Sequence, residues 1–190
     1  METLVKQSES ANLSEDQLFR LCAENKKLRI ERDKNKNIII MSPTGFLTEN
    51  FNSEILGELR DWNKKNKSGY VTGSSGGYYL PNGSMRAPDV AWTKKERIDK
   101  LSQKEKEKFP HICPDFVIEV RSKSDTLKQQ KEKMTEWIEN GCQLAWLIDL
   151  EHKTTHIYKP GAETTEQAFT KVLNGDTVLT GFKLKLSEII

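Results

Sequence analysis

The sequence predicts an α/β (α+β) domain built around one sheet, and three observations support this fold class. Apolar residues recur at helical spacing within residues 13–25, 47–66 and 126–141. Short runs rich in β-branched and aromatic residues, bounded by Gly, Pro and Asn, separate these segments. The resulting order is helix, strands, helix, strands, with no internal repeat and no linker, which is the pattern of one sheet packed against helices.

The three helical segments carry recognisable start and stop signals. Ser14 is suited to cap the first helix, and Thr126 with Gln129 forms a plausible capping box at the last. Gly141 suits the position after a helix end. The apolar stripes consist of Leu18, Leu21 and Cys22 in the first helix, Phe51, Ile55, Leu59 and Trp62 in the second, and Leu127, Met134, Trp137 and Ile138 in the third.

Strands are expected in the intervening segments. Residues 28–33 and 38–43 flank the turn-rich KNKN and predict a hairpin. Short strands split by Gly and Pro are expected within residues 69–93, and a buried strand at residues 116–121. The charge-dense segment 93–110 indicates a solvated connection with some helix. The remaining strands are expected at residues 143–150, 153–160, 168–173 and 176–186.

Length and composition favour one intracellular domain. With 190 residues, 35% of them hydrophobic and 31% charged, we expect a single domain over residues 14–190 after a flexible segment at 1–13. The net charge of +2 indicates no nucleic-acid partner by itself, so any such binding requires a local basic patch. Three scattered cysteines argue against a disulfide framework or a cysteine zinc site. Neither a membrane span nor a signal-peptide core is recognisable, which favours a soluble, cytoplasmic protein.

Two carboxylates stand out because they lie in apolar surroundings. Glu119 falls within the buried strand 116–121, and Asp89 lies in the short apolar segment 87–92. If these strands pair, the two acids can converge and hold a hard cation such as Mg²⁺. Arg121 points to the same face as Glu119, because side chains alternate along a strand. The alternative is structural: each acid forms a buried salt bridge, Glu119 with Arg86 or Arg121.

The segments that surround these acids also occur together in a known family. LRIERD, IIIMSPTG, YLPNGSMRAPDVAW, PDFVIEVRSKSD and KMTEWIENGCQLAWLID appear in that order and with family-like spacing. From about Leu18 onward the chain resembles the bacterial restriction endonuclease domain family of the PD-(D/E)xK nuclease superfamily. The resemblance implies a central mixed sheet flanked by helices and DNA cleavage dependent on Mg²⁺ or Mn²⁺. It also implies metal ligation by Asp89, Glu119 and the Val120 backbone carbonyl.

The cation of this site departs from the superfamily pattern. The third residue is usually Lys, whereas position 121 is Arg, which stays protonated and cannot act as a general base. Lys133 lies on the flank of the following helix, and the family resemblance places a Lys at this position. We therefore expect Lys133 to be the functional lysine and Arg121 to clamp a phosphate or a carboxylate.

Other residues are weaker candidates. Glu54 is a further possible metal ligand by resemblance, although an exposed helical Glu is the simpler interpretation, and Glu31 is left out of the site. The Lys residues at 123, 128, 131 and 133 indicate either a solvated helix face or contacts to a DNA backbone.

A homodimer is expected only because nucleases that cut both strands are commonly dimeric. The alternative function is a nuclease-like fold that binds nucleic acid or a protein without cutting, which Arg121 favours.

Overall fold

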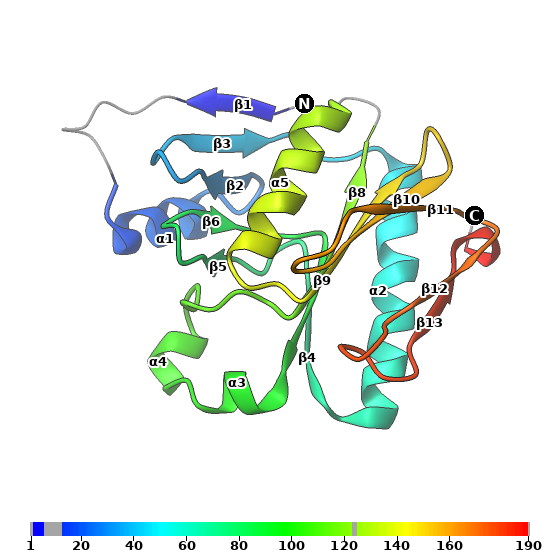
Figure 1. The fold of residues 1–190 in the computed structure, drawn as a ribbon. Helices are drawn as coiled ribbons and strands as arrows, with labels where there is room; N and C mark the ends of the chain where they lie inside the picture. Colours follow the sequence, from blue (N-terminus) through cyan, green and yellow to red (C-terminus); the bar gives the residue numbers. More distant parts are fainter. Residues whose placement is uncertain (1, 6–12, 123–124, 190) are drawn as a thin grey trace.

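A computed structural model describes residues 2–5, 13–122 and 125–189 of the chain (Figure 1). Within the segment expected to be flexible, residues 6–12 lie outside the described part. Glu2–Val5 form strand β1, which pairs with β3 in antiparallel register from Glu2↔Met41 to Val5↔Ile38. The sequence gives no strand signal for these four residues, because their conformation depends on a distant partner.

The central sheet is mixed, as expected from the family resemblance. Its six strands lie in the order β11-β10-β9-β8-β7-β4. Strand β7 pairs with β8 in antiparallel orientation, Val90 opposite Ile118, whereas β8 and β9 are parallel. The strands are β4 (Gly69–Gly73), β7 (Val90–Lys94), β8 (Phe116–Arg121), β9 (Leu144–Asp149), β10 (Thr154–Tyr158) and β11 (Thr165–Ala168).

Two helices pack against this sheet through separate hydrophobic clusters. Helix α2 (Phe46–Asn66) shares one cluster with Phe116 and Ile118 of β8, and helix α5 (Leu127–Glu139) shares another with Val117. Because side chains alternate along β8, Glu119 points to the same face as Val117, the face that α5 covers. The alternation therefore directs a buried carboxylate at a helix rather than at solvent.

A second, five-stranded sheet lies beside the first and has the order β1-β3-β2-β6-β5. Its other strands are β2 (Arg29–Arg32), β3 (Ile38–Met41), β5 (Tyr78–Tyr79) and β6 (Met85–Arg86). The expectation of one sheet is corrected here. Strands β5 and β6 have two residues each, too few for a periodicity signal, and β2 pairs with β6 through Arg32↔Met85.

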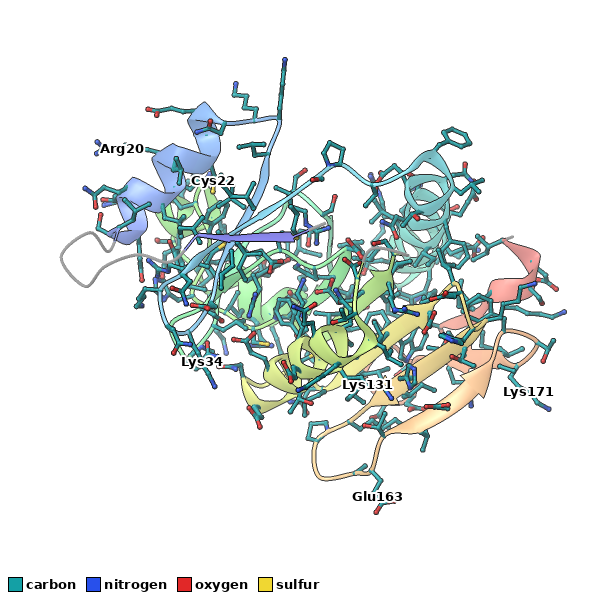
Figure 2. The ribbon with its side chains drawn as sticks, turned by 90° about the horizontal axis from the view of Figure 1, so that it is seen from above. Arg20, Cys22, Lys34, Lys131, Glu163 and Lys171 are labelled. Atoms are coloured by element: carbon teal, nitrogen blue, oxygen red, sulfur yellow. The ribbon has the colours of Figure 1, made fainter. Side chains whose placement is uncertain are left out.

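Helix α1 (Glu15–Glu24) covers the second sheet. Ser14 caps it in a full capping box with Gln17, as expected. Leu18 is fully buried in a cluster with Ile30, Ile38 and Met85. Seen from above, α1 carries Arg20 and Cys22 at one end of the molecule, and the β10–β11 turn with Glu163 lies at the other (Figure 2).

The remaining elements complete the connections. The charged segment forms two short helices, α3 (Lys95–Asp99) and α4 (Gln103–Lys106), as expected for a connection with some helix. Near the C-terminus, β12 (Val172–Asn174) and β13 (Lys183–Lys185) form a two-stranded sheet followed by the 3-10 helix η2 (Leu186–Glu188). Residues 176–182 therefore turn rather than extend, with positive φ at Asp176 and Gly181. In the part of the chain that the structure describes, no helix combines the length and apolar character that crossing a membrane requires.

Candidate active site

Strand pairing brings Asp89 to the backbone of β8. Asp89 immediately precedes β7, and its side chain accepts a hydrogen bond at Oδ2 from the Val120 backbone N–H, at 2.8 Å. Asp89 is 7% exposed and Glu119 is 3% exposed. The two acids that the sequence singled out thus lie buried at the junction of β7 and β8, and the Val120 backbone lies there too.

Lys133 reaches this junction from α5. Its Nζ atom lies 2.9 Å from Glu119 Oε1 and 3.0 Å from Glu31 Oε1. One helical turn later, Trp137 Nε1 donates to the same Glu119 oxygen at 3.0 Å. In Figure 1, α5 lies between the strands of the five-stranded sheet and β8, which is why a single lysine can contact an acid from each sheet.

Glu31 belongs to this cluster, which corrects the expectation from the sequence that it lies outside the site. It is 1% exposed and accepts hydrogen bonds from Arg86 Nη1 at 3.0 Å and from the Ala87 backbone N–H at 3.1 Å, in addition to its contact with Lys133. Arg86 also contacts Glu136 on α5, with Nε 2.8 Å from Oε2. The hairpin pattern around Glu31 fits a solvent-facing acid equally well, and only the β2–β6 pairing reveals its burial.

Arg29 of β2 also belongs to the cluster, through its contact with Asp89. Its Nη1 atom lies 2.6 Å from Asp89 Oδ1, and its Nη2 atom donates to the Ala87 carbonyl. The Arg29 side chain is 24% exposed, while that of Asp89 is 6% exposed. Arg29 therefore lies between Asp89 and the solvent.

The charges of this cluster do not cancel. Four carboxylates, of Glu31, Asp89, Glu119 and Glu136, face the three cations Arg29, Arg86 and Lys133. Burial, reinforced by the nearby Asp89 charge and opposed by Lys133, raises the pKa of Glu119 to about 7. Burial also acts on Glu31, but Lys133, Arg86 and Arg29 outweigh it and lower the pKa of Glu31 to about 2. Glu119 therefore binds a proton more readily than a free carboxyl group does, and this proton offsets part of the excess negative charge.

Arg121 binds a different pair of acids. Its Nη1 atom lies 2.9 Å from Asp149 Oδ2, and its Nη2 atom lies 2.9 Å from Glu151 Oε2. Asp149, Glu151 and His152 bring ligand atoms close enough together to hold a cation. The Arg121 guanidinium already supplies positive charge there, because it contacts both oxygens of the Asp149 carboxylate. The alternative pairing of Glu119 with Arg86 or Arg121 is therefore replaced by the contact with Lys133.

The remaining candidates lie elsewhere. Glu54 is exposed on α2. Lys128 is exposed on α5, with 88% of its side chain accessible, and Lys131 lies 4.0 Å from Glu166 of β11. Lys131 and the β10–β11 turn are both visible in Figure 2. Lys123 lies outside the described residues, so of the expected lysine group only Lys133 is placed within the acidic cluster.

The donor set fits a hard divalent cation. Asp89 and Glu119 offer carboxylate oxygens, and the hydrogen bond from the Val120 backbone N–H to Asp89 Oδ2 places Asp89 beside the residue that follows Glu119. Magnesium and manganese prefer such oxygen ligands and keep several waters. An ion bound there would offset the repulsion between the two acids.

The fold and the arrangement of its acids define a protein of the restriction-endonuclease-like class: two carboxylates at paired strands of a mixed sheet, and a lysine from the next helix. The chain belongs to the family Uma2, described as "Putative restriction endonuclease", whose sequence profile matches residues 15–187. Among solved structures, it is similar to a "putative nuclease belonging to DUF820" from Anabaena variabilis. The TM-score is 0.72 at 18% identity, over 84% of this chain and 88% of that one. No curated protein matches it.

Proposed function

We propose that this protein is a metal-dependent endonuclease that hydrolyses phosphodiester bonds of DNA at Asp89 and Glu119. The observation that carries the proposal is the convergence of Asp89, Glu119 and Lys133 from three different elements in a chain of a restriction endonuclease family. Mg²⁺ or Mn²⁺ bound by these acids would polarise the phosphate and lower the pKa of a bound water.

Each protein group has a distinct role in this proposal. Asp89 and Glu119 supply anionic oxygens, and the Val120 carbonyl is the third ligand expected from the family resemblance. Lys133 remains an ammonium, because Glu119 and Glu31 raise its pKa against the opposing effect of burial. It therefore donates hydrogen bonds and steadies negative charge on the phosphate, rather than removing a proton from water.

Glu31 and Trp137 position these groups. Glu31 holds the Lys133 ammonium together with Glu119, and Trp137 fixes the Glu119 carboxylate by its Nε1–H donor. The remaining cation, Arg29, is bonded to Asp89 and partly exposed, so a phosphate approaching from solvent would meet its guanidinium first.

The test is cleavage of supercoiled plasmid and of single-stranded DNA with Mg²⁺, with Mn²⁺ and with EDTA. Purified wild-type protein is compared with Glu119→Gln, with the Asp89→Ala/Glu119→Ala double variant and with Glu58→Gln, an exposed α2 control. We expect metal-dependent cutting by the wild type and the control, and at least a hundredfold loss in both site variants, about the scale of a lost charge-stabilising group. Equal cutting by the double variant would refute the assignment.

A second candidate function is binding without cutting. It is favoured by the contacts of the two acids, because Asp89 already forms an ion pair with Arg29 and Glu119 already forms one with Lys133, so neither acid needs a metal ion to neutralise it. Such a protein would hold nucleic acid or a protein partner on a nuclease-like fold. Titration with Mn²⁺ separates the two functions: a nuclease binds the ion and loses this binding in Glu119→Gln, whereas the non-cutting alternative binds no ion through these acids.

A further inference from the structure

A hollow of about 630 Å³ opens beside the candidate active site. It lies between β2, the segment after β3, the first turns of α2 and the β4–β5 turn, and we call it the β2–α2 hollow. Its lining includes Arg29, Ser42, Asn52, Ser74 and Met85. Its size is that of a site for a small molecule or for part of a polymer chain, and is too small for a whole duplex.

The hollow adjoins the catalytic acids through Arg29. This residue lines the hollow and also bonds to Asp89, and Ala87 of the same wall lies two residues before Asp89. A nucleic-acid strand with one phosphate at Asp89 and Glu119 would therefore place an adjoining nucleotide at the hollow. The exposed Lys26 and Lys27 line it as well and supply positive charge for the strand backbone.

Asn52 shows that the hollow is built for a polar ligand. Asn52 belongs to α2, and only 8% of the residue is exposed. Its Oδ1 atom is buried and has no hydrogen-bond partner among the described residues. Buried amides in folded proteins are nearly always paired, so an amide that lines a hollow and lacks a partner is suited to pair with a group that enters, once the side chain turns its oxygen toward the hollow.

The rest of the wall is suited to the flat face of a base. Ile30, Met41 and Met85 are buried apolar residues, while Ser42, Ser74 and Ser75 supply hydroxyls. Gly77 brings the backbone close to Phe109, since a Cβ atom there would lie 2.7 Å from the Phe109 ring. An apolar wall with a few polar groups is how enzymes hold a base that has left the stack.

We infer that the β2–α2 hollow binds one unpaired nucleobase next to the cut phosphate, with the Asn52 amide hydrogen-bonding to the edge of the base. This inference rests on the proposed function, because it assumes that the strand meets Asp89 and Glu119. In a duplex the base is stacked between its neighbours and held by its partner strand, so it cannot enter the hollow, and the site selects single-stranded or locally opened nucleic acid. An Asn amide pairs side-on with adenine through N6 and N7, so adenine is the preferred base.

The test is equilibrium binding without cleavage. The wild-type protein, in EDTA, is titrated into fluorescein-labelled oligo-dA of about a dozen nucleotides, a length within the site sizes of single-strand binders. Oligo-dT of equal length and the dA–dT duplex are the comparison probes. The variants are Asn52→Leu, which removes the amide at similar volume, and Asn52→Ser, which keeps a small polar group should Asn52→Leu fold poorly. Asn50→Leu, at an exposed α2 position, is the matched control.

Wild-type protein and the Asn50→Leu control should bind oligo-dA about tenfold more tightly than the duplex, and more tightly than oligo-dT. Both Asn52 variants should lose about tenfold in affinity for oligo-dA and lose the preference over oligo-dT, the scale of one side-on amide contact. Unchanged oligo-dA affinity in both folded Asn52 variants would overturn the inference, as would equal affinity for strand and duplex. Because the measurement needs neither metal nor cutting, a failure of cleavage leaves this readout intact and is recognised separately.

Discussion

At the scale of single residues, Lys133 is a buried cation held between two carboxylates. Its side chain is 10% exposed, and its ammonium contacts two carboxylates from different sheets. Removing it leaves Glu31 and Glu119 buried without their shared cation, which is far more costly than the loss of a surface pair.

We predict that Lys133→Met lowers the free energy of unfolding by about 3 kcal/mol, the cost of breaking a buried ion pair. The cleavage rate should fall as well. Lys128→Met is the matched control, because Lys128 lies on the same helix with 88% of its side chain exposed. Urea unfolding gives the stability and plasmid nicking gives the rate; full cleavage by folded Lys133→Met would refute its role and direct attention to Arg121.

A second prediction concerns Glu31 and acid. Its pKa is lowered from 4.5 to about 2, so it binds protons more weakly in the folded state than in the unfolded state. The resulting stability, on the order of 3 kcal/mol, is present above pH 4.5 and is lost as the pH falls toward 2. Glu31→Gln should therefore be less stable than the wild type at pH 7, and the gap should narrow on acidification. A gap that is constant over this range, measured by thermal unfolding, would contradict the lowered pKa.

At the scale of elements, the ends of β8 and β9 form a second charged junction. Arg121 ends β8 and pairs with Asp149, which ends β9 with its side chain 1% exposed. Asp149 also accepts hydrogen bonds from the backbone N–H groups of Glu151 and His152, so it organises the turn into β10.

We predict that Arg121→Met destabilises this junction by about 3 kcal/mol, because Asp149 stays buried without its cation. Mn²⁺ affinity should not change, since the guanidinium contacts Asp149 and Glu151. Arg60→Met, at an exposed position of α2, is the control. A selective loss of Mn²⁺ binding, with stability retained, would instead support Arg121 as a clamp at the metal.

The elements also show how far sequence reasoning reaches. Ser14 and Thr126 cap their helices as expected, because a cap is a contact within three residues of the chain. The buried Phe116, Val117 and Ile118 predicted β8 because burial on both faces leaves a continuous apolar run. In contrast, residues 176–182 read as a strand but form a turn, since a two-stranded sheet imposes little burial pattern.

The same distinction between local and long-range signals applies to the residues of the candidate site. Asp89, Glu119 and Lys133 could be proposed because acids in apolar segments and a family-like spacing are visible in the chain itself. Arg29 and Glu31 could not, because their roles depend on how β2 is placed beside Asp89 and α5, through contacts 60 and 102 positions apart in the sequence. The hollow depends on the same placement of β2, so the sequence of α2 alone does not indicate a binding role for Asn52.

At the scale of the whole molecule, the ion network joins two sheets that also share an apolar contact, because Tyr78 of β5 packs in the hydrophobic cluster of α5 and the six-stranded sheet. Arg86 of β6 contacts Glu31 of β2 and Glu136 of α5, and Lys133 adds the contact to Glu119 of β8. All four tryptophans, at positions 62, 92, 137 and 146, lie outside the five-stranded sheet. Tryptophan fluorescence therefore reports on the six-stranded sheet and its helices, whereas far-ultraviolet circular dichroism reports on both sheets.

We predict that wild-type protein unfolds in urea with coincident transitions by the two signals, as expected of one cooperative unit. In Arg86→Met the circular dichroism transition should begin at a lower urea concentration than the fluorescence transition, because the five-stranded sheet loses one of its ionic contacts with α5. Arg20→Met, an exposed α1 position, should behave as the wild type. Coincident transitions in Arg86→Met would show that the apolar contacts alone couple the sheets.

The positions of the three cysteines allow binding in the hollow to be followed by alkylation of one of them. Cys113 and Cys142 are buried, and burial raises the pKa of Cys113 to about 12, so both resist alkylation while the protein is folded. Burial raises the pKa of Cys22 too, but Cys22 is partly exposed and lines the β2–α2 hollow, so a reagent can reach it. A maleimide dye should therefore attach to native protein at this one sulfur, without any engineered substitution. The rate of attachment would then follow the occupancy of the hollow directly, slowing whenever a strand lies within it.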